Sequence, residues 1–476
     1  MKKIAVFIAA VVLVLTQIPI ASADIGDYAT IRLTDGSCWN FKPQIDDGMV
    51  VWWGYDGVYD SEIFFWNGTQ IIKLSDNEYD DSGPQIDDGK IVWNQYDGND
   101  LEIMLWDGSQ IVQITNNDVD DKDPQIDDGK IVWWAPGDGW DGAGVYHDDE
   151  IFLWDGTQII QLTDDVYYDF YPRIDDGMVT WTGMWSWWDE TDPEIFLWDG
   201  TQIIQLSDNT YLDASPQIDD GMVVWACWDW STDTEIFLWD GTQTIQLTDM
   251  DYCGLEPQID DGKVVWGASG ELFLWDGTQT IQITDNDYNE GYIQINDGMV
   301  VWVCMIGPWY DPDNEIFLWD GTNTIQIPQY EDYQIQEYPR MDDGMIVWEG
   351  WNSEGDHEIF LSGPITIEVS VDIKPGNYPN PVNLNSKGII SVAILTTPSF
   401  DASSVNAQMT RFGPAGATPV KSNFEDVDHD GDMDMILHFR TQDVGLACGD
   451  TDATLIGLTN YGEFFSGSDS IKTICK

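Results

Sequence analysis

The sequence predicts an all-β protein with two parts, a β-propeller of eight four-stranded blades and a small C-terminal β-sandwich-like domain. The segment PQIDDGMVVW at residues 43–52 recurs eight times in close or looser copies. The glycines of its Asp-Gly pair lie 36 to 48 residues apart, a period typical of propeller arrays. The segments between the turns are rich in Val, Ile, Phe and Trp, which favour strands over helices.

Each repeat contains four short segments with strand composition. In the first repeat, residues 43–46 and 49–52 flank an Asp-Gly pair, which favours the type I′ turn of a two-residue hairpin. An irregular loop follows, then a third strand at 62–66, a second turn and a fourth strand at 69–76. Four antiparallel strands make one propeller blade.

The N-terminal strand is expected to close the ring. Residues 29–36, ATIRLTDG, match the fourth strand of a repeat but precede the first complete one, and the last repeat has a doubtful fourth strand. The N-terminal segment therefore fits the last blade, which removes exposed sheet edges. The alternative is that residues 365–371, ITIEVSV, supply this strand themselves.

The chain is expected to have three parts. Residues 1–23 read as a secretory signal peptide, because two lysines precede an apolar segment that ends in a small-residue cleavage site. Residues 24–364 form the propeller and residues 365–476 the C-terminal module. We expect a secreted or cell-surface protein. No later apolar stretch is long enough to suggest a membrane span of the mature chain.

The formal net charge of −68 limits the possible partners. Such a surface repels nucleic acid and anionic lipid, and it argues against acidic polysaccharides as substrates. It favours bound cations or adaptation to salt. Part of the charge has a structural origin, because Asp is a turn residue and this chain has many turns.

Two residues recur in all eight repeats, and both are predicted to be structural. A Trp four residues after the glycine of each inner Asp-Gly pair (the marker glycine) suits packing between blades. A Glu that opens the third strand is expected to accept hydrogen bonds from a neighbouring blade's backbone or from an indole N–H. The tryptophans are Trp52, Trp93, Trp133, Trp181, Trp225, Trp266, Trp302 and Trp348. The glutamates are Glu62, Glu102, Glu150, Glu194, Glu235, Glu271, Glu315 and Glu358.

The loop between the second and third strands varies in length and carries the candidate ligand-binding residues. These loops lie on the face opposite the Asp-Gly turns and are rich in Trp, Tyr, Asp and Gly. Aromatic rings stack on sugars, and carboxylates accept hydrogen bonds from sugar hydroxyls. Ca²⁺ binding and simple packing of the loops on one another are the alternatives. The candidates are Trp140, Trp185, Trp187, Trp188, Trp228, Trp230, Trp309 and Tyr310.

The sequence contains little that indicates catalysis. Its four histidines show no metal-ligand spacing, and no G-x-S-x-G motif occurs. Arg173 and Arg340 replace Gln in the repeat and are expected near the channel. The first interpretation is a noncatalytic propeller that binds a saccharide or a surface partner. The alternatives are an extracellular glycan-degrading lyase or hydrolase and a purely structural envelope protein.

Six cysteines in an exported chain permit disulfides. Cys448 and Cys475 belong to the small C-terminal module and are expected to pair. Cys227 and Cys253 fall in loops of one propeller face and are a second candidate pair. Cys38 and Cys304 remain unassigned.

The segment DVDHDGDMD predicts a calcium loop in the C-terminal module. Its aspartates have the spacing of calcium ligands, and Gly431 permits a sharp turn. The position of the bidentate Glu of an EF-hand holds Leu437, and no flanking helices are expected, so the loop is of a helix-free type. An acidic surface turn is the alternative. The candidate ligands are Asp426, Asp428, Asp430, Asp432 and Asp434.

Two parts of the chain resemble known families. The recurring Asp-Gly hairpin and the "LT" strand end resemble TolB-like propellers over residues 29–364, which implies architecture more than activity. The segments DIKPG, VAIL, RFGP, EDVDHDGDMDMILHF and ACGDTDA are similar to a C-terminal accessory module of secreted or surface proteins of bacteria and archaea.

Overall fold

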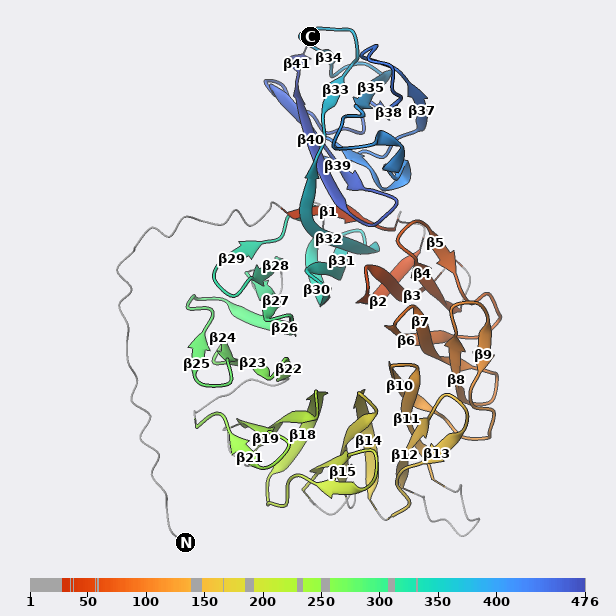
Figure 1. Cartoon of the computed structure of the whole chain (residues 1–476), viewed down its shortest axis with the longest axis vertical. Coiled ribbons are helices and arrows are strands. Elements are labelled where there is room, and N and C mark those ends of the chain that lie inside the picture. The colour runs from red at the N-terminus through yellow and green to blue at the C-terminus, as the bar shows by residue number, and fades with distance from the viewer. Residues whose placement is uncertain are drawn as a thin grey trace.

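The computed structural model describes residues 28–475 except for 35, 37, 56, 58–59, 138–147, 166, 185–191, 229–233, 250–256, 307–312 and 331–332. Eight antiparallel blades stand around a central axis, and a smaller β domain lies beside the eighth blade (Figure 1). The predicted all-β class, the eight blades and the additional C-terminal domain are confirmed.

The first seven blades each consist of four consecutive strands, paired in chain order from the axis outwards. Blade 1 contains β2 (Trp39–Asp46), β3 (Met49–Tyr55), β4 (Ser61–Trp66) and β5 (Ile71–Lys73). Blade 2 contains β6 (Asp81–Asp87), β7 (Lys90–Tyr96), β8 (Leu101–Trp106) and β9 (Ile111–Gln113). Blade 3 contains β10 (Lys122–Asp127), β11 (Lys130–Pro136), β12 (Asp149–Trp154) and β13 (Ile159–Gln161). Blade 4 contains β14 (Tyr168–Asp175), β15 (Met178–Met184), β16 (Glu194–Trp198) and β17 (Ile203–Gln205).

The remaining consecutive blades follow the same order. Blade 5 contains β18 (Leu212–Asp219), β19 (Met222–Trp228), β20 (Thr234–Trp239) and β21 (Thr244–Gln246). Blade 6 contains β22 (Gln258–Asp260), β23 (Lys263–Ala268), β24 (Glu271–Trp275) and β25 (Thr280–Gln282). Blade 7 contains β26 (Asn289–Asn296), β27 (Met299–Met305), β28 (Asn314–Trp319) and β29 (Thr324–Gln326).

The N-terminal strand closes the ring, as the sequence predicts. Blade 8 combines β30 (Tyr333–Asp342), β31 (Met345–Asn352) and β32 (His357–Glu368) with β1 (Tyr28–Arg32). Strand β1 pairs antiparallel with β32, with Ile31 opposite Leu361. Ile31 is fully buried in a core that includes residues of blade 8, blade 1 and the C-terminal module.

The two kinds of Asp-Gly turn differ in geometry. In the inner hairpins both residues have positive φ, for example 51° at Asp47 and 69° at Gly48, as a type I′ turn requires. In the outer hairpins only the glycine has positive φ. There the Asp side chain accepts hydrogen bonds from the turn, as Asp107 does from the backbone of Ser109 and Gln110 at 2.8 and 2.9 Å.

The recurring tryptophans form the core between blades, as predicted. All eight are buried, with at most 1% of each side chain exposed. In seven blades the indole stacks on a Phe of the third strand, as Trp181 does on Phe196 at 5.8 Å between ring centroids. Blade 2 has Met104 at this position, in the same core as Trp93.

The C-terminal module is joined to the ring by a continuous sheet. Strand β32 leaves blade 8 and pairs in parallel with β40, so one sheet contains strands of both parts. A second sheet has the order β33-β35-β38-β37, and β34 pairs with β41. The strands are β33 (Val371–Ile373), β34 (Pro381–Asn383), β35 (Ile389–Ile394), β36 (Arg411–Phe412), β37 (Lys421–Glu425), β38 (Asp434–Arg440), β39 (Asp452–Leu458), β40 (Phe464–Ser470) and β41 (Lys472–Ile474).

Within the described ranges the only helices are two short 3₁₀ turns, Ala402–Ser404 and Ala407–Met409. None of the helices described is long and apolar enough to cross a membrane. The predicted boundary at residues 364 and 365 falls inside β32 and stays a prediction.

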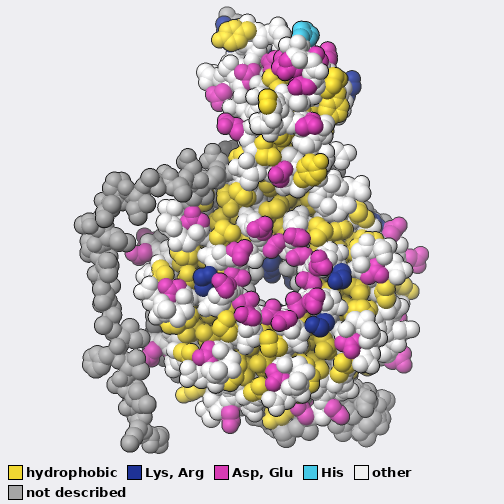
Figure 2. All heavy atoms as spheres, viewed as in Figure 1, with side chains coloured by type: hydrophobic (Ala, Val, Ile, Leu, Met, Phe, Trp, Pro, Cys, Tyr) yellow, Lys and Arg dark blue, Asp and Glu magenta, His cyan; other side chains and the backbone are white. Residues whose placement is uncertain are grey.

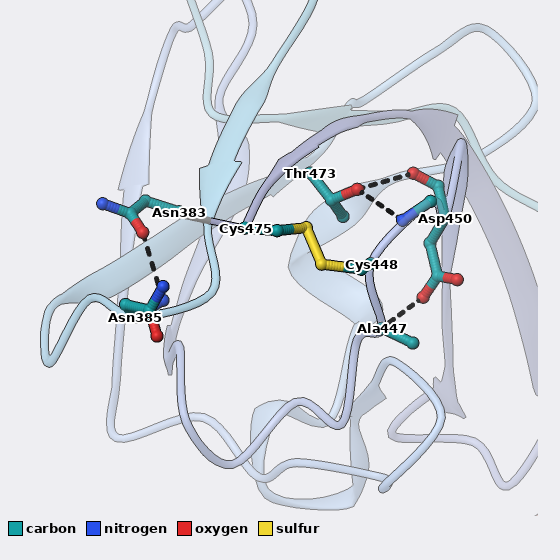
Figure 3. The surroundings of a disulfide bond; sticks show 8 residues. Asn383, Asn385, Ala447, Cys448, Asp450, Thr473 and Cys475 are labelled. Carbon is teal, nitrogen blue, oxygen red and sulfur yellow. Dashed lines mark hydrogen bonds between the residues drawn. A yellow bond between two sulfur atoms is a disulfide. The ribbon is translucent and has the colours of Figure 1, made fainter.

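The predicted disulfide between Cys448 and Cys475 is present, with a Cα–Cα distance of 5.9 Å (Figure 3). Beside it, Thr473 Oγ1 accepts a hydrogen bond from the amide of Gly449 at 3.0 Å. The second predicted pair stays untested, because Cys253 lies outside the described residues. Its proposed partner Cys227 is a buried thiol whose pKa is raised, first by burial and then by Asp213.

Candidate functional site

A ring of carboxylates surrounds one mouth of the axial channel. The inner hairpins of all eight blades meet there, and Figure 2 shows their acidic side chains around the open centre. Two residues directly precede each of the eight marker glycines. Of these sixteen residues fifteen are Asp, and the other is Asn296. Three lysines at the mouth pair loosely with this ring, at 3.5 to 3.9 Å from Asp88, Asp128 and Asp261. The mouth is therefore strongly negative.

The residue two positions before each marker glycine also lies against the turn of a neighbouring blade. The carboxylate of Asp342 accepts a hydrogen bond from the amide of Asp47 at 2.7 Å, and Asp175 accepts one from Asp220 at 2.7 Å. Asp260 and Asn296 make the corresponding bonds. In the other four blades the carboxylate faces the same turn, but Asp46, Asp87, Asp127 and Asp219 each retain one buried oxygen without a hydrogen bond.

Burial changes the titration of this ring. It raises the pKa of Asp46 and of Asp175 to about 6, against the smaller lowering effect of the neighbouring blade's backbone amide. The pKa values of Asp87, Asp127, Asp219 and Asp342 are raised for the same first reason. The inner aspartates therefore bind protons more readily than free carboxylates, and they favour a positive ligand when ionised.

The first strands of the blades line a cavity of about 480 Å³ in the channel. Arg173 and Arg340 line it, as their replacement of Gln in the repeat predicts. Arg340 Nε donates to Gln44 Oε1 at 3.2 Å, and both guanidinium groups donate to the carbonyl of the preceding proline at 3.0 Å. The other lining residues include Gln44, Gln85, Gln125, Gln217, Gln258, Gln294, Tyr171, Tyr292 and Tyr338. This side of the channel is rich in amide and guanidinium donors.

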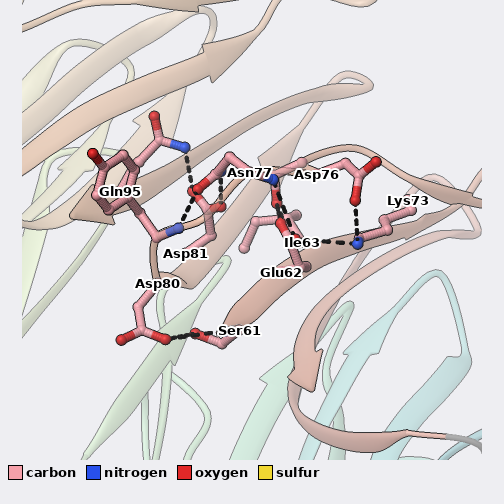
Figure 4. A network of polar contacts seen from close by, with 11 residues as sticks. Ser61, Glu62, Ile63, Lys73, Asp76, Asn77, Asp80, Asp81 and Gln95 are labelled. Carbon is pink, nitrogen blue, oxygen red and sulfur yellow. Dashed lines mark hydrogen bonds and ion pairs between the residues drawn. The ribbon is translucent and has the colours of Figure 1, made fainter. Parts of the chain in front are cut away.

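A second polar network connects neighbouring blades farther from the axis (Figure 4). Glu62 accepts a hydrogen bond from Ser75 at 2.7 Å and pairs with Lys73 at 3.1 Å. Asn77, in the connection between the blades, donates from its backbone to Glu62 at 3.3 Å and from its side chain to Asp81 at 2.7 Å.

Within blade 2, Asp81 also accepts bonds from the Trp93 indole at 2.8 Å and from the Gln95 amide at 2.9 Å. The recurring Glu is thus structural, as predicted, but the indole bonds to an Asp of its own blade.

Burial strongly perturbs the carboxylates of this network. It raises the pKa of Asp169 to about 8, of Glu150 and Glu194 to about 7, and of Asp81 to about 6. The sequence does offer a signal for these partners, because an acid or amide stands twelve residues before seven of the eight recurring tryptophans. Six of these residues accept the hydrogen bond of the indole.

The proposed aromatic binding face is not brought together by the described part of the chain. Trp140, Trp185, Trp187, Trp188, Trp230, Trp309 and Tyr310 lie outside the described residues. Trp228 ends β19 and is half-buried. The arrangement of these eight residues therefore stays a prediction.

The five aspartates of the predicted calcium loop do come together. Asp426, Asp428 and Asp434 have carboxylate oxygens within 4.8 Å of one another, and so have Asp428, Asp430 and Asp432. Asp434 is fully buried and accepts bonds from the amides of Val427 and Thr396 at 2.9 and 2.8 Å.

Two oxygens of this loop are left without a partner. Asp426 Oδ1 and Asp432 Oδ1 are buried and accept no hydrogen bond. Burial and the adjacent Asp430 raise the pKa of Asp432 to about 6. Such crowding of oxygens suits Ca²⁺, which takes six to eight oxygen ligands, some of them water.

One Ser-His-Asn contact in the module resembles a catalytic arrangement in composition only. Ser391 Oγ lies 3.0 Å from His438 Nδ1, and His438 Nε2 lies 2.9 Å from Asn423 Oδ1. All three residues lie on adjacent strands of one sheet, with Ser391 directly opposite His438. Strands β35, β38 and β37, which carry these residues, pair with one another in the sheet.

Comparison with solved structures gives matches of low similarity. The computationally designed Ika8 protein matches with a TM-score of 0.49 and 16% identity, over 69% of this chain and 98% of its own. The β-propeller domain of the Trilobed protease from Pyrococcus furiosus matches with a TM-score of 0.45 and 16% identity, over 62% of this chain and 99% of its own. That propeller domain has an open velcro topology, whereas β1 closes the ring here. No family model and no curated protein matches the chain.

A peptidase gives a third match. Acylaminoacyl peptidase from Pyrococcus horikoshii has a TM-score of 0.44 and 14% identity, and the match covers 66% of this chain. This chain spans 58% of that peptidase. At such identities the likeness concerns the propeller fold alone.

These findings correct the functional interpretation made from the sequence. The similar solved chains include a peptidase and a protease propeller, so the noncatalytic saccharide or surface-partner binder is not retained. Its glycan-degrading and structural alternatives are not retained either. Residues for catalysis are not identified among those that the structure describes.

Proposed function

We propose that the axial channel takes up a short peptide segment that carries positive charge. The observation that carries this proposal is the carboxylate ring at one mouth, followed by a cavity lined with Gln, Arg and Tyr. The ring attracts an ammonium group of the peptide. The guanidinium groups of Arg173 and Arg340 then donate hydrogen bonds to peptide carbonyls or to a terminal carboxylate.

The amide lining favours a peptide over other cations. Glutamine side chains both donate and accept hydrogen bonds, as a peptide backbone does. An aliphatic polyamine has no acceptor for Arg173 or Arg340, so it would use only the carboxylate ring. The two arginines therefore distinguish peptide uptake from simple attraction of cations.

Removing negative charge from the mouth of the channel should weaken peptide binding. The triple variant Asp47→Asn, Asp176→Asn and Asp220→Asn should weaken binding of a lysine-containing peptide about tenfold at low salt, because three charges leave the ring. These residues have φ near 50°, which Asn also adopts, so the turns should persist. Isothermal titration of the full chain measures the dissociation constant, with a glutamate-containing peptide of equal length for comparison.

The matched control removes the same charge elsewhere. Asp107→Asn, Asp155→Asn and Asp199→Asn change three outer turns whose Asp oxygen caps the loop, and Asn keeps that acceptor. This variant should bind the peptide nearly as the wild type does. Equal weakening by both triple variants, or equal binding of the two peptides, would refute uptake at the ring. Arg173→Gln with Arg340→Gln restores the repeat residue and should weaken peptide but not spermine binding.

The C-terminal module is proposed to bind Ca²⁺ at Asp426, Asp428, Asp430, Asp432 and Asp434. The two buried oxygens without partners support this, because an ion would satisfy them. The signal peptide at residues 1–23 supports a location outside the cell, where such modules meet abundant Ca²⁺. We also propose that the ring is a propeller of the TolB-like kind, because of its recurring Asp-Gly hairpin and "LT" strand end.

Calcium should therefore stabilise the module. Since Ca²⁺ binds the folded loop and not the unfolded chain, 1 mM Ca²⁺ should raise the melting temperature of the full chain above its value in chelator. Asp428→Ala should remove the part of this rise that belongs to the loop. The measurement uses an Asp97→Asn background, because Asp97 belongs to a second group of carboxylates, in blade 2. An unchanged calcium response in Asp428→Ala would leave the segment as an acidic turn.

A further inference from the structure

A second group of carboxylates lies in blade 2, away from the channel and the C-terminal module. Asp97 and Asp100 lie in the loop between β7 and β8, Glu102 lies in β8, and their oxygens lie within 4.8 Å of one another. The loop is tightly turned, because the amides of Asn99 and Asp100 donate to Asp97 Oδ1 at 2.8 and 3.3 Å. Three acidic groups are thus held together by the backbone.

The central member of this group is buried without a partner. Asp100 is 4% exposed, and neither of its carboxylate oxygens has a hydrogen bond. Glu102 Oε2 is also buried without one, while its Oε1 accepts from the Asn117 amide at 2.9 Å. Burying an unpaired carboxylate is costly unless a cation or donor compensates it.

Neighbouring charges increase the need for a cation. Asp118 and Asp120 add negative potential at Asp100, and Lys122 pairs with Asp120 at 3.3 Å. Burial raises the pKa values of both Asp100 and Glu102. In the described part of the chain, no lysine or arginine forms an ion pair with Asp97, Asp100 or Glu102.

Blade 1 shows how the same position is neutralised by the protein itself. There the equivalent glutamate, Glu62, pairs with Lys73 at 3.1 Å (Figure 4). The residue at the position of Lys73 in blade 2 is Gln113, since these residues face Phe64 and Met104 in the same register. Blade 2 therefore lacks the cation that blade 1 provides.

Blade 8 shows a second way to satisfy this position. Asp356 precedes Glu358 as Asp100 precedes Glu102, and Asp356 Oδ2 accepts a hydrogen bond from the Asn352 amide at 3.0 Å. In blade 2 the corresponding turn is held by Asp97, whose Oδ1 accepts loop amides as Asn352 Oδ1 does in blade 8. A carboxylate thus takes the place of the Asn352 side-chain amide and offers a third ligand.

We propose that Asp97, Asp100 and Glu102 bind one divalent cation, and that Ca²⁺ is the ion that fits best. The ligands are all carboxylate oxygens, which hard cations prefer. Three carboxylates from one six-residue segment form an irregular ligand set, which the flexible coordination of Ca²⁺ tolerates better than Mg²⁺, which needs near-ideal octahedral geometry and keeps more of its water. The ion would fix the β7–β8 loop on the rim of the propeller.

Asp97→Asn tests this site, because it reproduces the amide of blade 8. The experiment uses the full chain with Asp428→Ala, so that the C-terminal loop does not contribute. In this background 1 mM Ca²⁺ should raise the melting temperature, and Asp97→Asn should abolish the rise. In chelator, Asp97→Asn should melt higher than the background, since it removes one charge and supplies a donor to Asp100.

Gln113→Lys gives an independent test that keeps all three ligands. The new lysine should pair with Glu102 as Lys73 pairs with Glu62, raise the melting temperature in chelator and weaken Ca²⁺ binding at least tenfold by isothermal titration. Gln161→Lys, at the same strand position of blade 3, is the matched control and should leave Ca²⁺ binding unchanged. Equal Ca²⁺ responses of the background, Asp97→Asn and Gln113→Lys chains would overturn the proposal.

Discussion

Truncating Ile31 to Ala should destabilise the whole propeller by about 2–5 kcal/mol, the usual range for a buried Ile that leaves a cavity. Ile31 is fully buried where blade 8, blade 1 and the C-terminal module meet. Because β1 is the strand that closes the ring, the loss affects the cooperative unit rather than a single blade. Chemical denaturation followed by Trp fluorescence measures the change.

Ile111→Ala is the matched control, because Ile111 also lies on an outermost strand but is 41% exposed. We expect its effect to stay within about 0.5 kcal/mol, as for surface substitutions. A chain without residues 1–33 should lose more than Ile31→Ala, since it exposes the edge of β32 to aggregation. Equal midpoints for Ile31→Ala and Ile111→Ala would show that β1 does not close the folded ring.

The protein should be more stable at pH 5 than at pH 8 in the presence of chelator. In the folded chain the pKa of Asp169 is about 8, and those of Glu150 and Glu194 are about 7, chiefly because of burial. The same groups titrate near pH 4 when unfolded. The folded state therefore holds more protons between these values, and the free energy of unfolding falls as pH rises. We expect the melting temperature to drop by on the order of 5 °C.

Asp169→Asn isolates one contributor to this pH dependence. The Trp181 indole donates to Asp169 at 2.8 Å, and in blade 1 an amide already takes this role, since Trp52 donates to Asn40 at 2.8 Å. Asn should therefore keep the hydrogen bond, raise the melting temperature at pH 8 and leave it nearly unchanged at pH 5. A wild-type melting temperature that increases from pH 5 to pH 8 would contradict the assignment of these raised pKa values.

The repeat made most of the fold predictable. Residues such as Trp52 recur at fixed distances from an Asp-Gly turn, and this regularity determines strand order, the inner hairpins and the packing between blades. The closing strand was predictable because residues 29–36 match the fourth strand of a repeat although they precede the first complete repeat. The disulfide between Cys448 and Cys475 followed from their location in one small module.

The sites depended on contacts that no period reveals. Asp100 lacks both the lysine that blade 1 has at Lys73 and the side-chain amide that Asn352 supplies in blade 8. The carboxylate ring reads in sequence as ordinary turn residues such as Asp47, and only closure of the ring brings eight turns to one mouth. The partner of the recurring Glu was missed because Ser75 and Asn77 belong to the strand end and the connection that follow it.

Strand β32 has a mechanical consequence for the molecule. It pairs with β1 in the ring and with β40 in the module, so tension applied at the C-terminal domain reaches the seam of the ring through one strand. Five residue pairs join β1 to β32 over Tyr28–Arg32. A pull along the strands loads these hydrogen bonds together, in shear, rather than one after another. We expect the ring to resist stretching from this end better than a domain tethered by a flexible linker.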